Sequence, residues 1–372
     1  MIRHLTEQDI QFMARAIELA GRGKGWVNPN PLVGAVIVKE GRIIAEGWHE
    51  RCGGLHAERN AFLHAQEDTA GATLYVTLEP CCHYGKTPPC TEAIIEHRIA
   101  RVVVGMTDPN PLVAGKGIGI LRNAGIEVVT GVEEEKAQKQ NEIFLKYITT
   151  RMPWVVMKTA MTLDGKIAAY TGDSRWVTGE KARQKVQEMR ATYMGIMVGS
   201  GTVQADDPML NCRLEGEIRQ PVRIVVDSGA GISLDCRLVE TAKEYRTIVA
   251  HTCRAEEEKL TALKQKGIEV LLCKEQECRV EMSDLMRLLG QLGIDSVLLE
   301  GGGQLNETML RQGLVDEVYA FIAPKFIGGK EAKTPVEGEG LPRMSEAILL
   351  KEVEVEMVED DILVKGRVQY GE

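Results

Sequence analysis

Runs of apolar, β-branched residues alternate with amphipathic runs along the 372-residue chain. In the N-terminal third, VGAVIV (33–38) and TLYVTL (73–78) lie on either side of an amphipathic run at 56–65. The pattern starts again with WVVMKTAM (154–161) and continues with MGIMVGS (194–200). Strands that alternate with helices assemble into α/β sheets, so both parts of the chain are predicted to be α/β.

The alternation is interrupted at Pro153, shortly after a long polar helix predicted over residues 133–150. Proline cannot continue a helix and also restricts the residue before it. A chain of this length exceeds what one hydrophobic core usually serves. We therefore predict two domains, residues 1–150 and residues 151–372.

Both ends of the chain carry local signals. Thr6 followed by Asp9 is typical of a helix N-terminus, because each side chain can cap a free backbone N–H group. Near the C-terminus, residues 348–358 and 361–370 flank Glu359-Asp360. This arrangement predicts an antiparallel hairpin at the edge of the second sheet.

The composition narrows the possible partners. Asp and Glu (54) outnumber Lys and Arg (45), and the net charge of −9 argues against a general nucleic-acid-binding surface. The N-terminal segment is amphipathic and charged throughout, unlike a signal peptide, and no apolar run approaches the ~18 residues of a membrane span. Nine cysteines without an export signal favour free thiols or a metal over disulfides. We expect a cytoplasmic protein without a membrane partner.

The strongest local signal is His56-Ala57-Glu58, followed by Cys81 and Cys90, each directly after a proline. A catalytic zinc needs three protein ligands and one open position for water, and these residues supply one nitrogen and two sulfurs. Glu58 follows on the first turn of a predicted helix, where it can face that water without ligating the metal. Zinc lowers the pKa of such a water to about 7, and a carboxylate can pass its proton to leaving ammonia.

The alternative interpretation of this cluster is a noncatalytic zinc-binding scaffold. Three ligands beside an unligated Glu58 form an open pattern, which favours catalysis. Cys82 and His83 are further candidate ligands, but chain neighbours rarely reach the same metal, so both are predicted to form pocket wall. Cys90 also precedes a predicted helix, whose N-terminal dipole favours a thiolate.

This constellation resembles the zinc-dependent cytidine and nucleobase deaminases, whose pattern is H-x-E followed by P-C-x-x-C. Here eight residues, CHYGKTPP, separate the two cysteines instead of two. That spacing, with the motifs at 28–34, 47–49 and 107–111, resembles the deaminase domain of the riboflavin-biosynthesis deaminase–reductases. The resemblance implies a cytidine-deaminase-like α/β/α fold and a pyrimidine-ribose-phosphate pocket lined by Asn30, His49, Lys86, Asp108 and Asn110. Lys86 is the cation suited to the substrate phosphate.

The C-terminal half lacks the G-x-G-x-x-G of an ordinary Rossmann fold. Instead, a β-rich run ends in three glycines, 301–303, and passes into a predicted helix, whose free N–H groups can cradle a dinucleotide's phosphates. Three glycines alone are commonly just a tight turn. Segments 157–166, 174–176 and 198–208 strengthen the dinucleotide interpretation, because ligands of open α/β sheets collect at such strand ends.

Together these segments resemble the reductase domain of the same family, which has a dihydrofolate-reductase-like α/β fold and uses NADPH. The resemblance implies NADPH contacts from Ala160, Trp176, Thr202, Asp206, Ser228, Gly302, Gly303, Gln304, Leu305, Asn306, Glu307 and Thr308. It also implies substrate contacts from Lys158, Ser174, Arg190, Leu210, Arg213 and Glu300. Arg190 and Arg213 suit a ribose phosphate, because a guanidinium group binds phosphate in a bidentate manner.

The resemblance covers nearly the whole chain and implies a bifunctional enzyme with Zn²⁺ and NADPH. It would deaminate 2,5-diamino-6-ribosylamino-4(3H)-pyrimidinone 5′-phosphate and then reduce the ribosyl group to ribityl. A nucleic-acid base deaminase with an appended domain would instead need a basic groove and stacking aromatics, whereas aromatics are 5% of this chain. A single-activity relative would have lost one motif set, yet both sets are intact. We expect a homo-oligomer that acts on a small molecule.

Overall fold

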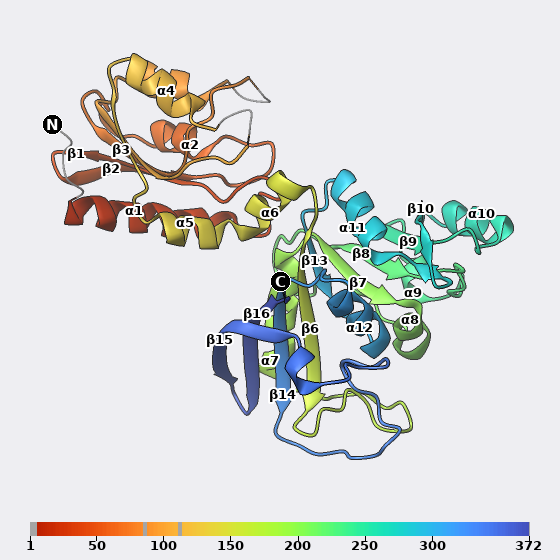
Figure 1. The fold of residues 1–372 in the computed structure, drawn as a ribbon. Coiled ribbons are helices and arrows are strands. Elements are labelled where there is room, and N and C mark those ends of the chain that lie inside the picture. Colours follow the sequence, from red (N-terminus) through yellow and green to blue (C-terminus); the bar gives the residue numbers. More distant parts are fainter. Residues whose placement is uncertain (1–5, 85–87, 111–113, 372) are drawn as a thin grey trace. The chain divides into compact units, whose positions relative to one another are not determined.

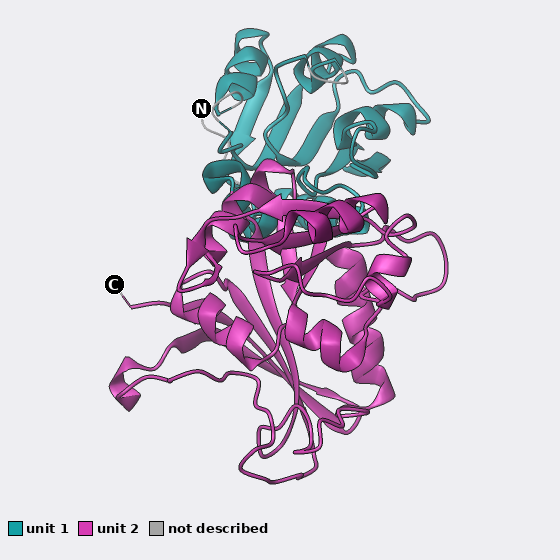
Figure 2. Cartoon of the chain, turned by 90° about the vertical axis from the view of Figure 1, so that its right-hand side faces the viewer, with its two compact units in different colours: residues 1–151 teal, residues 152–372 magenta. Residues whose placement is uncertain are grey.

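The computed structural model describes residues 6–84, 88–110 and 114–371. The chain divides into two compact units, residues 1–151 and residues 152–372 (Figure 2). The division lies one residue beyond the one expected from the sequence. None of the helices in the described ranges is long and apolar enough to span a membrane.

The described strands of unit 1 form one five-stranded sheet in the order β2-β1-β3-β4-β5. They are β1 (Gly34–Lys39), β2 (Arg42–Trp48), β3 (Thr73–Leu78), β4 (Arg101–Met106) and β5 (Glu127–Thr130). Strand β1 runs antiparallel to both β2 and β3, whereas β3, β4 and β5 are mutually parallel. The carboxyl ends of β3 and β4 therefore meet at one edge of the sheet.

Helices cover both faces of this sheet (Figure 1). They are α1 (Glu7–Ala20), the 3₁₀ turn η1 (Gly21–Gly23), α2 (Ala57–Leu63), α3 (Cys90–Glu96), α4 (Lys116–Asn123), α5 (Glu134–Gln140) and α6 (Glu142–Thr150). Successive residues of β1 face opposite sides: Ile37 packs with α2, α3 and α4, and Val36 packs with α1. The predicted α/β/α layering is confirmed.

The long helix predicted over residues 133–150 is interrupted at Asn141, which separates α5 from α6. The buried Asn141 side chain donates to the Leu32 carbonyl (3.0 Å) and accepts from the Leu32 N–H (2.8 Å). The break thus coincides with side-chain contacts to a distant backbone, which helical periodicity does not indicate.

The described strands of unit 2 include a nine-stranded sheet in the order β10-β9-β8-β7-β13-β6-β14-β16-β15. They are β6 (Trp154–Thr162), β7 (Gly195–Gly199), β8 (Val222–Val226), β9 (Thr247–His251), β10 (Glu269–Leu272), β13 (Ser296–Leu299), β14 (Glu317–Ala323), β15 (Leu349–Val358) and β16 (Asp361–Gln369). A separate hairpin joins β11 (Glu275–Gln276) and β12 (Arg279–Val280).

The large sheet is parallel from β10 to β14 and antiparallel beyond it. The predicted C-terminal hairpin at the sheet edge is confirmed by β15 and β16. Strand β14 was not foreseen, although it pairs with β6 along its whole length.

Helices of unit 2 lie against both faces of its sheet. They are α7 (Glu180–Thr192), α8 (Ser200–Asp206), α9 (Arg237–Glu240), α10 (Glu257–Gln265), α11 (Met282–Gln291), α12 (Gly303–Arg311) and the 3₁₀ turn η2 (Met344–Glu346). One core joins β8 and β13 to α11 and α12, and a second joins β7 and β8 to α8, α9 and α10. The predicted α/β architecture of the second domain is therefore also confirmed.

A buried ion pair ties the first helix to the sheet of unit 1. The predicted capping box is present, since Thr6 and Asp9 cap each other. Asp9 is 1% exposed and also accepts two hydrogen bonds from Arg101 on β4 (2.7 and 3.1 Å) and one from the Tyr75 hydroxyl on β3 (2.8 Å). Burial alone would raise the pKa of Asp9, but the hydrogen bonds from Arg101, Thr6 and Tyr75 hold it well below its usual range.

We predict that Asp9→Asn lowers the free energy of unfolding of unit 1 by about 3 kcal/mol, because Arg101 stays mostly buried and keeps only its longer contact with Glu127 (3.5 Å). The lowered pKa means that the carboxylate stabilises the fold above its unfolded pKa of about 3.9, and that this stability is lost as pH falls through the folded pKa. Calorimetry of the full chain measures the change. The control is Asp68→Asn, because Asp68 and Arg98 form an exposed pair (3.6 Å) that water and salt screen. Equal shifts in the two variants would contradict the prediction.

Candidate active sites

Three metal-ligating side chains converge in unit 1. The ligand atoms of His56, Cys81 and Cys90 all lie within 4.8 Å of one another. Nδ1 of His56 is 3.4 Å from each of the two sulfurs. His56 caps the start of α2, Cys81 follows β3, and Cys90 begins α3. The fold thus brings together three ligands that are far apart in the sequence, at the ends of α2, β3 and α3.

The cluster fits a zinc ion. Zn–S and Zn–N bonds of ~2.3 and ~2.0 Å at tetrahedral angles place the nitrogen and sulfur ~3.6 Å apart, close to the separations observed here. His56 and the two cysteines supply three donors, the number that a catalytic zinc takes from protein. The donor chemistry and the geometry therefore agree on zinc with one position left for water.

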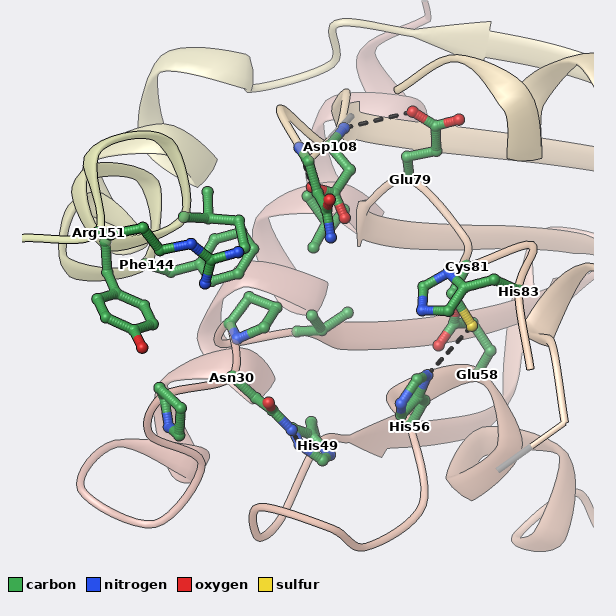
Figure 3. A pocket seen from close by; sticks show the side chains of 17 residues that line it. Asn30, His49, His56, Glu58, Glu79, Cys81, His83, Asp108, Phe144 and Arg151 are labelled. Atoms are coloured by element: carbon green, nitrogen blue, oxygen red, sulfur yellow. Dashed lines mark hydrogen bonds between the residues drawn. The ribbon is translucent and has the colours of Figure 1, made fainter. Parts of the chain in front are cut away.

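Glu58 lies beside this cluster on the first turn of α2 and is 3% exposed (Figure 3). Burial, and next the negative charge of Cys81, raise the pKa of its carboxyl group. A raised pKa makes it easier for this carboxylate to take up a proton, as a proton carrier must.

The two cysteines lie in different electrostatic surroundings. Hydrogen bonds from Cys90 and His56 lower the pKa of Cys81 to about 4, whereas the neighbouring Cys81 and burial raise the pKa of Cys90. The Cys90 N–H, at the start of α3, donates to the sulfur of Cys81 (3.3 Å), so the helix start also stabilises negative charge on that neighbouring sulfur.

Two residues that the sequence analysis did not assign hold this site in place. Glu79, buried directly after β3, accepts hydrogen bonds from the backbone N–H groups of Asp108, Gly115 and Ile118 (2.9–3.3 Å). Arg59 donates to the carbonyls at 88 and 89, just before Cys90. The position of Glu79 directly before Pro80-Cys81 is the sequence feature that could have indicated its role at this site.

A cavity of about 360 Å³ opens in front of the cluster (Figure 3). Its wall includes the predicted residues Asn30, His49, His56, Glu58, Cys81, Asp108 and Asn110, and also His83. Cys82 is not part of this wall, and Lys86 lies outside the described residues. Arg151, Phe144 and Tyr147 also line the cavity, which the sequence analysis did not foresee.

Burial shifts the pKa of two polar side chains in this cavity, His49 and Asp108. His49 contacts the Leu55 carbonyl through Nδ1 (2.8 Å) and Asn30 through Nε2 (3.1 Å). If Nδ1 carries the proton, Nε2 accepts from the Asn30 amide, and burial lowers the pKa of His49 in keeping with a neutral ring. Burial raises the pKa of Asp108. The wall can thus offer hydrogen bonds to a polar heterocycle.

In unit 2 the central feature is a buried group of three charges. Glu300 is 9% exposed, accepts two hydrogen bonds from Arg190 (2.8 and 2.9 Å) and pairs with Lys158 (3.0 Å). Burial alone would raise the pKa of Glu300, but the two cations hold it well below its usual range. Glu300 is therefore a fixed negative charge.

This group lies on the wall of a cavity of about 330 Å³. The predicted residues that line it are Lys158, Ala160, Ser174, Trp176, Arg190, Thr202, Asp206, Leu210, Arg213, Glu300, Gly302 and Asn306. Arg183, which the sequence analysis did not select, also lines it and lies over the Trp176 ring at 4.5 Å.

A second cavity of about 600 Å³ adjoins the first. It is lined by the predicted cofactor residues Thr202, Asp206, Ser228, Gly302, Gly303, Gln304, Leu305 and Thr308. A β-carbon at residue 303 would lie 2.3 Å from the Glu337 side chain, so glycine is needed there. Helix α12 begins at the same residue, with its N–H groups toward the turn.

Four predicted cofactor residues do not fit that cavity. Ala160 and Trp176 line the smaller cavity instead. Asn306 is buried and donates to the Gly301 and Pro335 carbonyls, so its side chain supports the glycine turn. Glu307 lines neither cavity, because it pairs with Arg311 one turn along α12. The predicted cofactor residues include the continuous run 302–308, but successive side chains of a helix point to different sides, so they cannot all line one cavity.

Family models match both units. Residues 6–106 match the "Cytidine and deoxycytidylate deaminase zinc-binding region", and residues 153–364 match the "RibD C-terminal domain". Among curated relatives, the riboflavin biosynthesis protein RibD of Actinobacillus pleuropneumoniae is 54% identical over 96% of this chain and 95% of its own length. RibD of Escherichia coli is 40% identical over 95% and 98%.

Two solved structures are similar to nearly the whole chain. A diaminohydroxyphosphoribosylaminopyrimidine deaminase/5-amino-6-(5-phosphoribosylamino)uracil reductase from Thermotoga maritima has a TM-score of 0.86 and 44% identity, over 97% of this chain and 99% of that one. RibD of Acinetobacter baumannii has a TM-score of 0.88 and 38% identity, over 98% and 99%.

The folds and sites thus define a zinc-dependent deaminase domain joined to an NADPH-dependent reductase domain. The chain belongs to the RibD family of bifunctional deaminase–reductases of riboflavin biosynthesis. Membership of this family confirms the two predicted activities and the predicted cofactors, zinc and NADPH.

We predict that Cys90→Ser loses most of its zinc, because serine replaces one of the three donors of the cluster. Metal analysis of the purified chain should give about one zinc per wild-type chain and far less in the variant. Cys82→Ser is the matched control, because Cys82 neighbours a ligand but is not part of the cluster, and it should keep its zinc. Full zinc in Cys90→Ser would contradict the assignment.

Proposed function

We propose that unit 1 deaminates the diaminopyrimidine ribosyl 5′-phosphate with Glu58 as the proton carrier. The observation that supports this is the buried Glu58 beside an open cluster of three donors in one cavity. His56, Cys81 and Cys90 hold the zinc ion, which when bound supplies a Lewis acid that activates water near neutral pH. Glu58 takes the proton from water and delivers it to the departing amine.

The remaining wall of this cavity orients the pyrimidine. Asn30, His49, Asp108 and Asn110 offer amide, imidazole and carboxyl groups to the ring edge and the ribose, and Lys86 is proposed for the phosphate. Glu79 acts through Asp108, since it fixes the backbone of that residue. It is a positioning residue, not a catalytic one.

Unit 2 is proposed to reduce the deaminated product in the smaller of its two cavities. NADPH, when bound, would supply a hydride for the ribosyl C1′, and a proton taken up with it completes the reduction to the ribityl chain. Lys158 and Glu300 face the substrate as a fixed pair, and Ser174 and Leu210 complete that wall. Arg190 and Arg213 bind the phosphate.

We propose that this chain is a cytoplasmic homo-oligomer with no nucleic-acid partner. The net charge of −9 supports the absence of a nucleic-acid surface. The free edge strand β15 exposes Val353, Val355 and Met357, and a second copy could cover them. Sedimentation of the purified chain distinguishes monomer from oligomer.

The first test of the deaminase assignment is Glu58→Gln, which keeps the shape and removes the base. We predict unchanged zinc content and a fall in ammonia release by at least ~10²-fold, the usual scale of acid–base catalysis. Ammonia and zinc are measured on the same preparation with the phosphorylated diaminopyrimidine as substrate. Loss of zinc would show that Glu58 is a ligand.

The second test separates the two activities. Glu300→Gln should lower NADPH oxidation with the deaminated intermediate by at least ~10-fold, because Lys158 and Arg190 lose their common partner. Ammonia release should stay near the wild-type rate, since the groups proposed for it belong to unit 1. Glu269→Gln is the control, because Glu269 forms an exposed pair with Arg246 (2.8 Å).

Zinc chelation is the complementary experiment. It should stop ammonia release and leave reduction of the deaminated intermediate intact. If reduction stopped as completely, and added zinc restored both activities, the proposed division of labour between the units would be wrong.

A further inference from the structure

The two cavities of unit 2 share part of their walls, and this fixes the direction of the cofactor. The shared residues are Ile167, Ser174, Thr202, Asp206 and Gly302. Hydride passes directly between nicotinamide and substrate, so the nicotinamide must lie where the cavities meet. The adenosine then lies at the end of the larger cavity that the substrate cavity does not share.

That far end is built by β8 and by the β11–β12 hairpin. Val226 ends β8, and Ser228 follows it. The Val280 N–H donates to the Ser228 hydroxyl (3.0 Å), which fixes the hairpin against the end of β8. Met282, at the start of α11, adds an apolar side chain to this part of the wall. The place suits an adenine ring with its ribose.

Arg279 is the cation at this end. It immediately precedes Val280 on β12 and lines the larger cavity but not the smaller one. Among the described residues, no carboxylate forms an ion pair with it, although Glu275 and Glu277 belong to the same hairpin. Its charge is therefore available to an anion in the cavity.

The other cation of this wall, Lys333, lies at the opposite end. Its backbone carbonyl accepts from the Ile167 N–H (2.9 Å), and Ile167 is one of the shared residues. Its ammonium group also has a partner in Glu337, at 3.9 Å. Lys333 thus belongs to the nicotinamide side.

We propose that Arg279 binds the 2′-phosphate of NADPH and thereby makes the reductase select NADPH over NADH. This inference rests on the proposed function of unit 2. The two cofactors differ only by that phosphate on the adenosine ribose, at the end where Arg279 lies. A guanidinium group can donate two parallel hydrogen bonds to a phosphate. Ser228 accepts from Val280, which leaves its hydroxyl hydrogen free to be donated to the same ribose.

The test measures equilibrium binding of NADP⁺, NAD⁺, 2′,5′-ADP and 5′-AMP to the full chain by calorimetry. We expect Arg279→Gln to weaken binding of NADP⁺ and 2′,5′-ADP by at least ~10-fold, because both ligands lose charge-assisted hydrogen bonds to the guanidinium group. Binding of NAD⁺ and 5′-AMP should not change. Arg279→Lys should recover part of the preference, and the wild-type preference should weaken as salt rises.

Lys333→Gln is the matched control, because it removes the other cation of the same cavity. It should leave the ratio of NADP⁺ to NAD⁺ affinity unchanged. The proposal is overturned if Arg279→Gln keeps the wild-type ratio, if it weakens both dinucleotides equally, or if Lys333→Gln abolishes the ratio instead. Binding of neither dinucleotide to the wild-type chain would instead contradict the proposed function of unit 2.

Discussion

Both sites depend on one constraint, namely that parallel strands bring their carboxyl ends to the same edge of a sheet. In unit 1, Leu78 of β3 pairs with Met106 of β4, so the segments that carry Cys81 and Asp108 leave the sheet side by side. In unit 2, Leu299 of β13 pairs with Met157 of β6. Lys158 is the next residue of β6, and Glu300 directly follows the end of β13. The register therefore creates the ion pair before any ligand is present.

The two buried glutamates show how surroundings separate chemical roles. Glu58 is buried near a negative sulfur, and the pKa of its carboxyl group is raised. Glu300 is buried between two cations, and its pKa is lowered. The first is shifted toward binding a proton, whereas the second keeps its charge and pairs with Lys158 and Arg190. Identical side chains are thus suited to proton transfer in one unit and to electrostatic positioning in the other.

The sequence predicted those features that depend on residue type and short spacing. His56, Cys81 and Cys90 were found because few residue types bind zinc, and the glycine turn because only glycine fits at 303. Contacts between distant segments were not predicted. The break at Asn141 depends on Leu32, and the place of Arg279 depends on a hairpin that Ser228 anchors. Neither Asn141 nor Arg279 belongs to a recognisable sequence motif, and the significance of each depends on a contact that forms only in the folded chain.

Phosphate recognition links the two proposed reactions, because deamination leaves the phosphate of the substrate unchanged. In the smaller cavity of unit 2, Arg190 is paired with Glu300, whereas no carboxylate forms an ion pair with Arg213 among the described residues. Partial burial, and then repulsion from Arg190 and Arg237, lower the pKa of its guanidinium group. A phosphate bound beside Arg213 would offset the repulsion between these arginines, so this part of the cavity favours an anion. If Arg279 binds the cofactor phosphate at the far end of the adjoining cavity, the two phosphates are bound by different arginines. Substrate and cofactor would then not compete for the same positive charge, although the chain as a whole is acidic.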